Sequence, residues 1–185
     1  GETHPQTINV FLNKAKECGI LGEGLETTSC RIWFADQCGF MRKRRMREAP
    51  ECELKGVYQE KNMQTAYVAL QVLRNYTHIQ LSAAHIQQGF AQVCTLTGLR
   101  GRWEILKQQP LVICDTAHNS HGIQYVATQL QTLHAKQLWI VFGMVADKDI
   151  NEVLRLMPAN ARYIFTTPNT QRAMSAQEMA ERWRA

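Results

Sequence analysis

No apolar run in this 185-residue sequence is long enough to cross a membrane. The longest stretches, at 111–114 and 138–146, fall far short of the roughly 20 residues that a membrane helix needs. The first residues lack a basic segment followed by an apolar one, so no signal peptide is visible. With 45% hydrophobic and 20% charged residues, the composition is typical of a globular protein. We therefore expect a cytoplasmic, globular protein without a membrane partner.

Closely spaced metal ligands are also missing. None of the six cysteines forms a CxxC pair, and zinc sites depend on such short ligand pairs. His118 and His121 are three residues apart, but no third ligand follows them closely in the sequence. We predict no metal ligands in this chain, and we expect its cysteines to be reduced thiols.

The two common phosphate-binding loops are absent as well. The sequence contains neither G-x-x-x-x-G-K-[ST] nor G-x-G-x-x-G. It also has no initiator methionine at position 1. On these grounds the chain is not expected to be a self-contained P-loop enzyme.

A basic run at 42–47 accounts for the whole net charge of +5. Five of the 21 Lys and Arg residues lie in this run, and the others balance the 16 Asp and Glu residues. Proteins that bind nucleic acid usually spread basic residues over a face and interleave aromatic ones. We therefore interpret the run as a solvated loop and expect no nucleic-acid partner. A non-catalytic RNA-binding module using residues 42–47 is the alternative.

The first half of the chain is expected to be mainly helical. Apolar residues recur at helical spacing in three segments, with Thr3 and Ser82 as possible caps for the first and third. A short strand at 30–35 and one or two edge strands around 53–59 are predicted between them. The three predicted helices cover residues 5–19, 60–76 and 82–94.

The second half of the chain alternates between strands and helices. After a turn-rich connector at 98–102 and a short segment at 103–106, buried strands are predicted with helices between them. Such alternation with short connections is typical of a parallel, doubly wound α/β sheet. We place a domain boundary near 96–102, which divides the chain into 1–96 and 97–185. The predicted strands are 111–114, 138–143 and 162–167, and the predicted helices are 121–134, 150–157 and 175–184.

Polar clusters follow two of these predicted strands. In an open α/β sheet, ligands bind beyond the carboxyl ends of the strands. The first cluster spans 115–120 and places a carboxylate, an imidazole and a carboxamide at a strand-to-helix turn. The second spans 143–149, where Asp147 or Asp149 can cap the next helix. Capping explains one residue of the first cluster but not all of them, so we interpret it as a functional site.

Four motifs follow one another along the chain: GVYQEKNMQTA (56–66), GLRGR (98–102), LVICDTAHNSHGI (111–123) and VFGMVADKDI (141–150). In this order they resemble the GxYQxxNxxxA, GLPGR, DGAHNP and FGxxxDKD motifs of folylpolyglutamate synthase and dihydrofolate synthase, the folate branch of the Mur ligase superfamily. Three residues depart from the family pattern, with Arg100 for Pro, Thr116 for Gly and Ser120 for Pro. None of these departures removes a charged or amide group.

The resemblance implies a fold and a place within a longer enzyme. The fold would be the tail of a Mur-ligase-type central ATPase domain in residues 1–96, followed by most of a Rossmann-like C-terminal α/β domain in residues 97–185. The family's P-loop, its magnesium ligands and its modified lysine lie upstream of the matched motifs. We therefore expect a C-terminal fragment, inactive alone, of a monomeric enzyme.

The resemblance also implies a reaction and residue roles. ATP and Mg²⁺ would convert a carboxylate of dihydropteroate or a folate into an acyl phosphate, which the amine of L-glutamate then attacks. Asn62 would contact the adenine, Arg102 the phosphates and Asp115 the ribose. His118 and Asn119 would lie near the glutamate, with His118 and Asp115 as the catalytic pair. A Mur-type peptide ligase, acting on a peptidoglycan precursor, is the alternative within the same superfamily.

Overall fold

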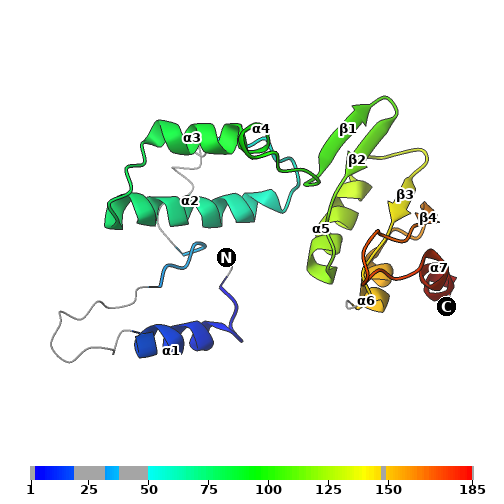
Figure 1. Ribbon diagram of the computed structural model, residues 1–185, viewed down its shortest axis with the longest axis horizontal. Helices are drawn as coiled ribbons and strands as arrows, with labels where there is room; N and C mark the ends of the chain where they lie inside the picture. The colour runs from blue at the N-terminus through cyan, green and yellow to red at the C-terminus, as the bar shows by residue number, and fades with distance from the viewer. Residues whose placement is uncertain (1–2, 19–31, 38–49, 147–148, 185) are drawn as a thin grey trace. The chain divides into compact units, whose positions relative to one another are not determined.

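The computed structural model describes residues 3–18, 32–37, 50–146 and 149–184 (Figure 1). The chain divides into two compact units. Unit 1 comprises residues 1–53 and 59–98, and unit 2 comprises residues 54–58 and 99–185. The short segment 54–58 therefore belongs with the second half of the chain, which the sequence did not indicate. Within the described residues, none of the helices is long and apolar enough to cross a bilayer.

The described part of unit 1 contains four helices, and α2 packs against α3 (Figure 1). The predicted helix 82–94 is divided at Gln92 into two helices, and the second ends at Gly98 in a left-handed conformation. Ser82 caps α3 as predicted: its Oγ accepts from the backbone N–H of His85, and the His85 ring accepts in return from the Ser82 N–H. The helices are α1 (Ile8–Cys18), α2 (Gln59–Tyr76), α3 (Ala83–Ala91) and α4 (Val93–Thr97).

Several local predictions for the first 58 residues are wrong. Thr3 does not cap α1, because its backbone N–H and hydroxyl both donate to the Asp36 carboxylate, at 2.7 and 2.6 Å. The described part of the predicted strand 30–35 forms no strand, and residues 35–37 make a turn. Residues 53–58 also form no strand. The pattern in these short segments was a weak signal, since tertiary context routinely overrides β-propensity. The basic run at 42–47 lies outside the described residues.

The described part of unit 2 contains two small sheets and three helices. Antiparallel β1 (Glu104–Gln108) and β2 (Leu111–Cys114) form a hairpin, and β3 (Trp139–Phe142) pairs in parallel with β4 (Arg162–Phe165). The helices are α5 (Ser120–Gln131), α6 (Ile150–Leu156) and α7 (Ala176–Arg184). The mixed α/β class and the order of strands and helices agree with the prediction.

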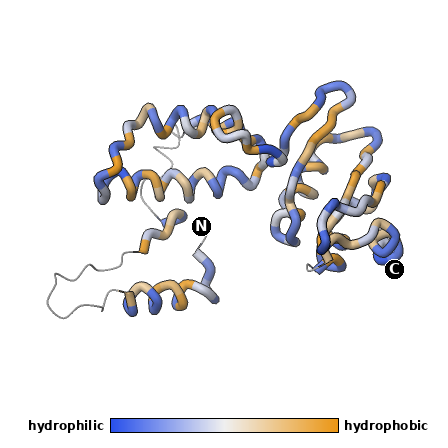
Figure 2. Tube along the Cα trace, viewed as in Figure 1, coloured by the Kyte–Doolittle hydropathy of each residue, from blue (hydrophilic) through white to orange (hydrophobic). Residues whose placement is uncertain are grey.

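The predicted parallel pairing of the strand 111–114 is wrong. Only two residues separate β1 from β2, so antiparallel pairing closes a far shorter loop than pairing with a later strand would. The hairpin is also not buried, because Leu111 is 46% exposed. Figure 2 shows apolar residues along its strands and polar residues at its tip. Strand β3 likewise buries only one face, since Phe142 is buried while Val141 is 68% exposed.

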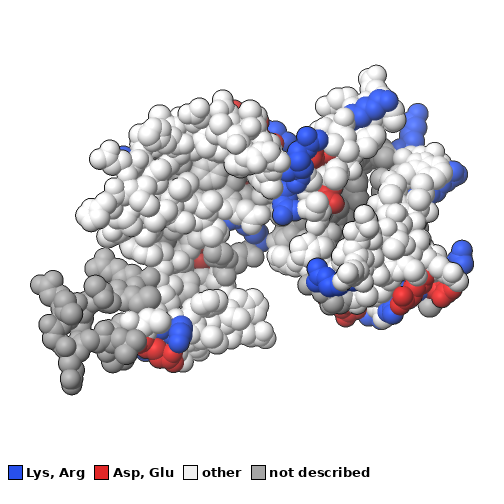
Figure 3. Space-filling model, viewed as in Figure 1, with Lys and Arg blue, Asp and Glu red and all other residues white. Residues whose placement is uncertain are grey.

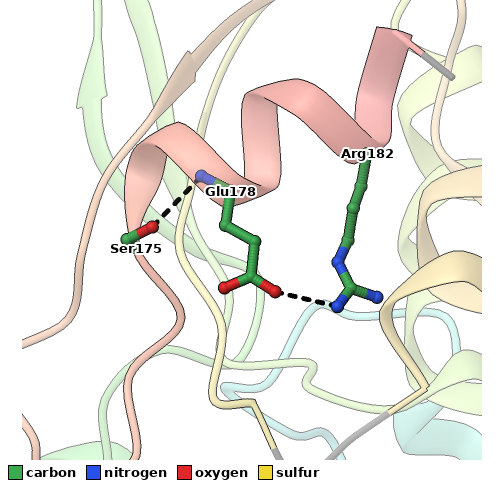
Figure 4. A network of polar contacts seen from close by, with 3 residues as sticks. All are labelled: Ser175, Glu178 and Arg182. Atoms are coloured by element: carbon green, nitrogen blue, oxygen red, sulfur yellow. Dashed lines mark hydrogen bonds and ion pairs between the residues drawn. The ribbon is translucent and has the colours of Figure 1, made fainter.

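The core of unit 2 lies between its helices and the β3–β4 pair. Its most buried side chains are Met179 of α7 and Val153 of α6, and Ile123 of α5 belongs to the same apolar cluster. Burying a side chain of this size contributes roughly 1.5–3 kcal/mol. Local signals also set the start of α7: the Ser175 hydroxyl accepts from the Glu178 N–H, and the Glu178 carboxylate pairs with Arg182 one turn later (Figure 4). Packing and capping thus place three strand-to-helix turns of unit 2 around one apolar core.

Candidate functional site

The turn that leads into β1 closes against the end of β2. Gly101 has φ +69° and Trp103 has φ +52°, so both adopt left-handed backbone conformations. A Cβ atom on Gly101 would lie 2.5 Å from Cγ2 of Thr116, which leaves room only for glycine. The Gly101 carbonyl accepts from the Thr116 N–H at 2.9 Å and from its hydroxyl at 3.0 Å. These bonds hold the turn beside the first polar cluster.

Asp115, the first residue after β2, is the centre of this arrangement. Its Oδ2 accepts from the Tyr58 hydroxyl and from the Trp103 N–H, both at 2.7 Å. Its Oδ1 accepts from the Ala117 N–H at 2.8 Å. A carboxylate offers about four acceptor positions. Asp115 therefore joins three chain segments and retains one acceptor position on Oδ1 for a ligand.

Tyr58 reaches Asp115 because the segment 54–58 is held in place from both sides. A Cβ on Gly56 would lie 2.7 Å from Cε1 of Tyr58, so glycine lets the tyrosine ring fold back over the backbone. Gln129 of α5 accepts from the Val57 N–H at 2.8 Å and donates to the Lys55 carbonyl at 3.1 Å. The sequence interpretation missed Tyr58, although it lies inside the GVYQEKNMQTA motif.

Arg102 keeps most of its hydrogen-bonding capacity. Its Nη1 donates to the Thr116 hydroxyl, and this is the hydrogen bond that the Arg102 side chain makes among the described residues. A guanidinium group carries five N–H donors in a fixed fork suited to phosphate or carboxylate oxygens. Thr116 thus orients Arg102, and the remaining donors can take an anion.

His118 and Asn119 lie in the same turn but differ in their local roles. The exposed His118 ring has Nδ1 3.1 Å from the Thr116 carbonyl. Asn119 is the N-cap of α5, and its Oδ1 accepts from the Gly122 N–H at 2.7 Å. Capping therefore uses the oxygen of the Asn119 amide and leaves its nitrogen as the group that can donate to a ligand.

Glu104, the first residue of β1, places a carboxylate against the turn that leads into β1. It accepts from the Gly101 N–H at 2.8 Å and pairs with Arg100. The hydrogen bond from Gly101, together with Arg100, lowers the pKa of the Glu104 carboxyl below its ordinary value. Figure 3 shows basic and acidic side chains together on the visible face of unit 2. The charge at this turn is therefore mixed rather than uniformly basic.

Asn62, the predicted adenine contact, belongs to unit 1. It lies in the first turn of α2, where its Nδ2 donates to Oε1 of Gln59 at 3.0 Å. The Gln59 side chain is buried, whereas Asn62 is exposed. The sequence interpretation singled out Asn62 but missed Gln59, three residues earlier and on the same side of the helix.

The second polar cluster is only partly described, since residues 147 and 148 lie outside the described ranges. A Cβ on Gly143 would lie 2.8 Å from the Thr166 carbonyl oxygen, so the backbone approaches closely here. Asp149 caps α6 by accepting from the Glu152 N–H at 3.0 Å. The predicted capping by Asp147 or Asp149 is thus confirmed for Asp149. No group of three His, Cys, Asp or Glu side chains suited to a metal occurs among the residues described.

Comparison with known proteins gives consistent matches over this part of the chain. Residues 101–185 match the family model of the glutamate ligase domain of the Mur ligases. Folylpolyglutamate synthase of Lacticaseibacillus casei is 31% identical over 126 residues, which is 67% of this chain and 28% of that protein.

Solved structures show the same likeness. Mycobacterium tuberculosis folylpolyglutamate synthase, complexed with ADP and AMPPCP, superposes with a TM-score of 0.60 at 25% identity, over 71% of this chain and 29% of that one. A bifunctional folylpolyglutamate synthase/dihydrofolate synthase with Mn, AMPPNP and L-glutamate bound gives 0.54 at 29% identity, over 72% and 30%. The chain thus spans less than a third of the length of each of these relatives.

Proposed function

Since the chain belongs to the folylpolyglutamate synthase/dihydrofolate synthase family, with the Mur ligase glutamate ligase domain at residues 101–185, we propose that it forms part of an ATP-dependent ligase that adds L-glutamate to folates. In this reaction a substrate carboxylate takes the γ-phosphate of ATP, which leaves ADP and an acyl phosphate. The glutamate amine then attacks the acyl carbon and expels phosphate, forming the amide bond. The acceptor is a folate or dihydropteroate.

The arrangement around Asp115 is the observation that carries this proposal. Its carboxylate is held by three donors and keeps one acceptor position, which suits a ribose hydroxyl. Arg102 keeps donors for phosphate oxygens as negative charge shifts during transfer. Both residues belong to motifs of the family, and both are positioned by contacts within unit 2.

The remaining roles are assigned residue by residue from the family motifs. Asn62 contacts the adenine, and His118 and Asn119 lie near the incoming glutamate. His118 presents an exposed imidazole and Asn119 an amide nitrogen, which suit the carboxylates of that amino acid.

A divalent cation is part of the proposed reaction, since it neutralises the charge on the transferring phosphates. The family resemblance places the ligands of this ion upstream of the matched motifs, and that assignment stays a prediction. The sequence-based expectations of a monomer and of a cytoplasmic location stay predictions.

The test uses the full-length enzyme that contains this chain. It measures glutamate-dependent ADP release with a folate acceptor. Arg102→Ala and Asp115→Ala are each expected to lower kcat/KM by about 10²-fold or more, the usual loss when a group that stabilises developing charge is removed. Arg155→Ala, a charge removal in the last turn of α6, is the matched control and is expected to stay near wild type. Near-normal turnover in both site variants would refute the assignment.

A further inference from the structure

Gln59 is the one buried polar side chain among the described residues, and only half of its amide is used. Its side chain is 4% exposed. The oxygen Oε1 accepts from Asn62, while the nitrogen Nε2 has no hydrogen-bond partner among the described residues. Burying an unpaired amide nitrogen costs free energy that an apolar side chain of the same size would avoid. Packing alone therefore does not account for glutamine at this position.

The used half of the Gln59 amide orients the exposed amide of Asn62. The two residues lie three positions apart in the first turn of α2, and Nδ2 of Asn62 donates to Oε1 of Gln59 at 3.0 Å. While the Gln59 oxygen faces Asn62, the opposite orientation of the Asn62 amide would place two carbonyl oxygens against each other. Because an amide nitrogen carries two hydrogens, Asn62 keeps one N–H and its Oδ1 for a ligand. One donor and one acceptor thus remain side by side.

This donor–acceptor pair distinguishes adenine from guanine. Adenine presents an N6 amino donor next to the N7 acceptor, and the amide of asparagine matches both. Guanine presents two acceptors, O6 and N7, so the oxygen of Asn62 would face another oxygen. An asparagine whose amide could turn freely would discriminate less, because it could rotate to suit either base.

We propose that Gln59 is a positioning residue that holds the Asn62 amide in the orientation that selects adenine over guanine nucleotides. This inference rests on the proposed function, in which Asn62 contacts the adenine of ATP. It adds a residue that the motif assignment leaves without a role, and it explains why a half-unpaired glutamine is buried there.

The test measures the Kd values of ADP and GDP by titration calorimetry on the full-length enzyme, together with the Tm. A well-formed two-bond contact discriminates against the wrong base by about 5- to 150-fold, and wild type is expected to prefer ADP by a factor in that range. Gln59→Met is expected to lose most of this preference through weaker ADP binding. Its Tm is expected to equal or exceed that of wild type, because the unpaired amide is gone.

Two further variants separate orientation from structure. Gln59→Glu keeps an acceptor oxygen at the same reach and is expected to retain the preference. Gln64→Met, on the same helix, removes an amide that donates to the Ala35 carbonyl at 3.0 Å rather than contacting Asn62, and is expected to keep the wild-type ratio.

The inference is overturned if Gln59→Met binds ADP and GDP in the wild-type ratio, or if it lowers the Tm and weakens both nucleotides equally. Absence of glutamate-dependent ADP release from the wild-type enzyme, with ADP binding intact, would instead overturn the proposed function.

Discussion

Replacing Tyr58 with Phe removes one hydroxyl group and leaves the aromatic ring in place. That hydroxyl donates to Oδ2 of Asp115 at 2.7 Å, and the same oxygen accepts from the Trp103 N–H. Hydrogen bonds to charged groups contribute about 1.5–3 kcal/mol. Tyr58 and Asp115 are half-buried rather than fully buried, which favours the lower end of that range. We therefore expect Tyr58→Phe to lower the free energy of unfolding of unit 2 by about 1.5 kcal/mol.

Urea unfolding of the purified chain, followed by tryptophan fluorescence, measures this loss. Three of the four tryptophans lie in unit 2, and Trp103, which is 5% exposed, lies beside the broken bond, so the emission reports mainly on unit 2. For a protein of this length the loss corresponds to a fall in Tm of about 3–6 °C. Tyr67→Phe is the matched control, because the Tyr67 hydroxyl makes no hydrogen bond with any described residue, and we expect no change in its midpoint.

A double-mutant cycle assigns the effect to the bond itself. Tyr58→Phe and Asp115→Asn, alone and combined, are expected to show a coupling energy of about 1 kcal/mol, because the two side chains interact directly. Additive effects, within about 0.3 kcal/mol, would contradict the conclusion that Tyr58 holds Asp115.

Two further predictions concern the turn before β1. Gly101→Ala introduces a Cβ atom at φ +69°, 2.5 Å from the Thr116 methyl group. It is expected to lower the free energy of unfolding, measured by urea unfolding, by about 2 kcal/mol or more. The control is Gly89→Ala, where a Cβ meets no atom within 4 Å. Equal losses in both variants would refute the close contact. The pKa of Glu104 is lowered in the folded state. The stabilising effect of the Glu104 carboxylate is therefore fully present above about pH 4.3, the pKa of glutamate in an unfolded chain. It is lost as the pH falls through the lower pKa of the folded state. The difference in unfolding midpoint between wild type and Glu104→Gln is therefore expected at pH 7 and not at pH 2.5, and a difference that does not change with pH would count against this account.

Helix positions were predictable where the signal was local. Ser82 and His85 form a capping box within four residues, and the start of α3 follows from those side chains alone. Even there a boundary was missed, because α3 ends at Ala91 and α4 begins at Val93 within the single predicted helix. A local pattern carries little information about such breaks, since helix ends depend on what packs nearby.

Strand pairing was not predictable to the same degree. The segment 111–114 is apolar enough for a buried parallel strand, yet it pairs antiparallel with its nearest neighbour in sequence and stays partly exposed. Strand pairing is a contact between segments, so a pattern read within one segment cannot choose the partner. The parallel pairing of β3 with β4 followed from the helix between them, because such a crossover favours parallel strands.

The amino-acid sequence by itself determined the α/β class, the order of the elements and the polar residues that follow β2. Spacing, caps and motifs depend on residues close together in the chain, so one sequence is enough to identify them. The tertiary structure decided what those residues contact: Tyr58 reaches Asp115 across 57 positions, and Thr116 anchors Arg102 across 14. Hydrogen bonds between distant positions exist only once the fold has brought the segments together, so the support of Asp115 could not be deduced from the order of residues.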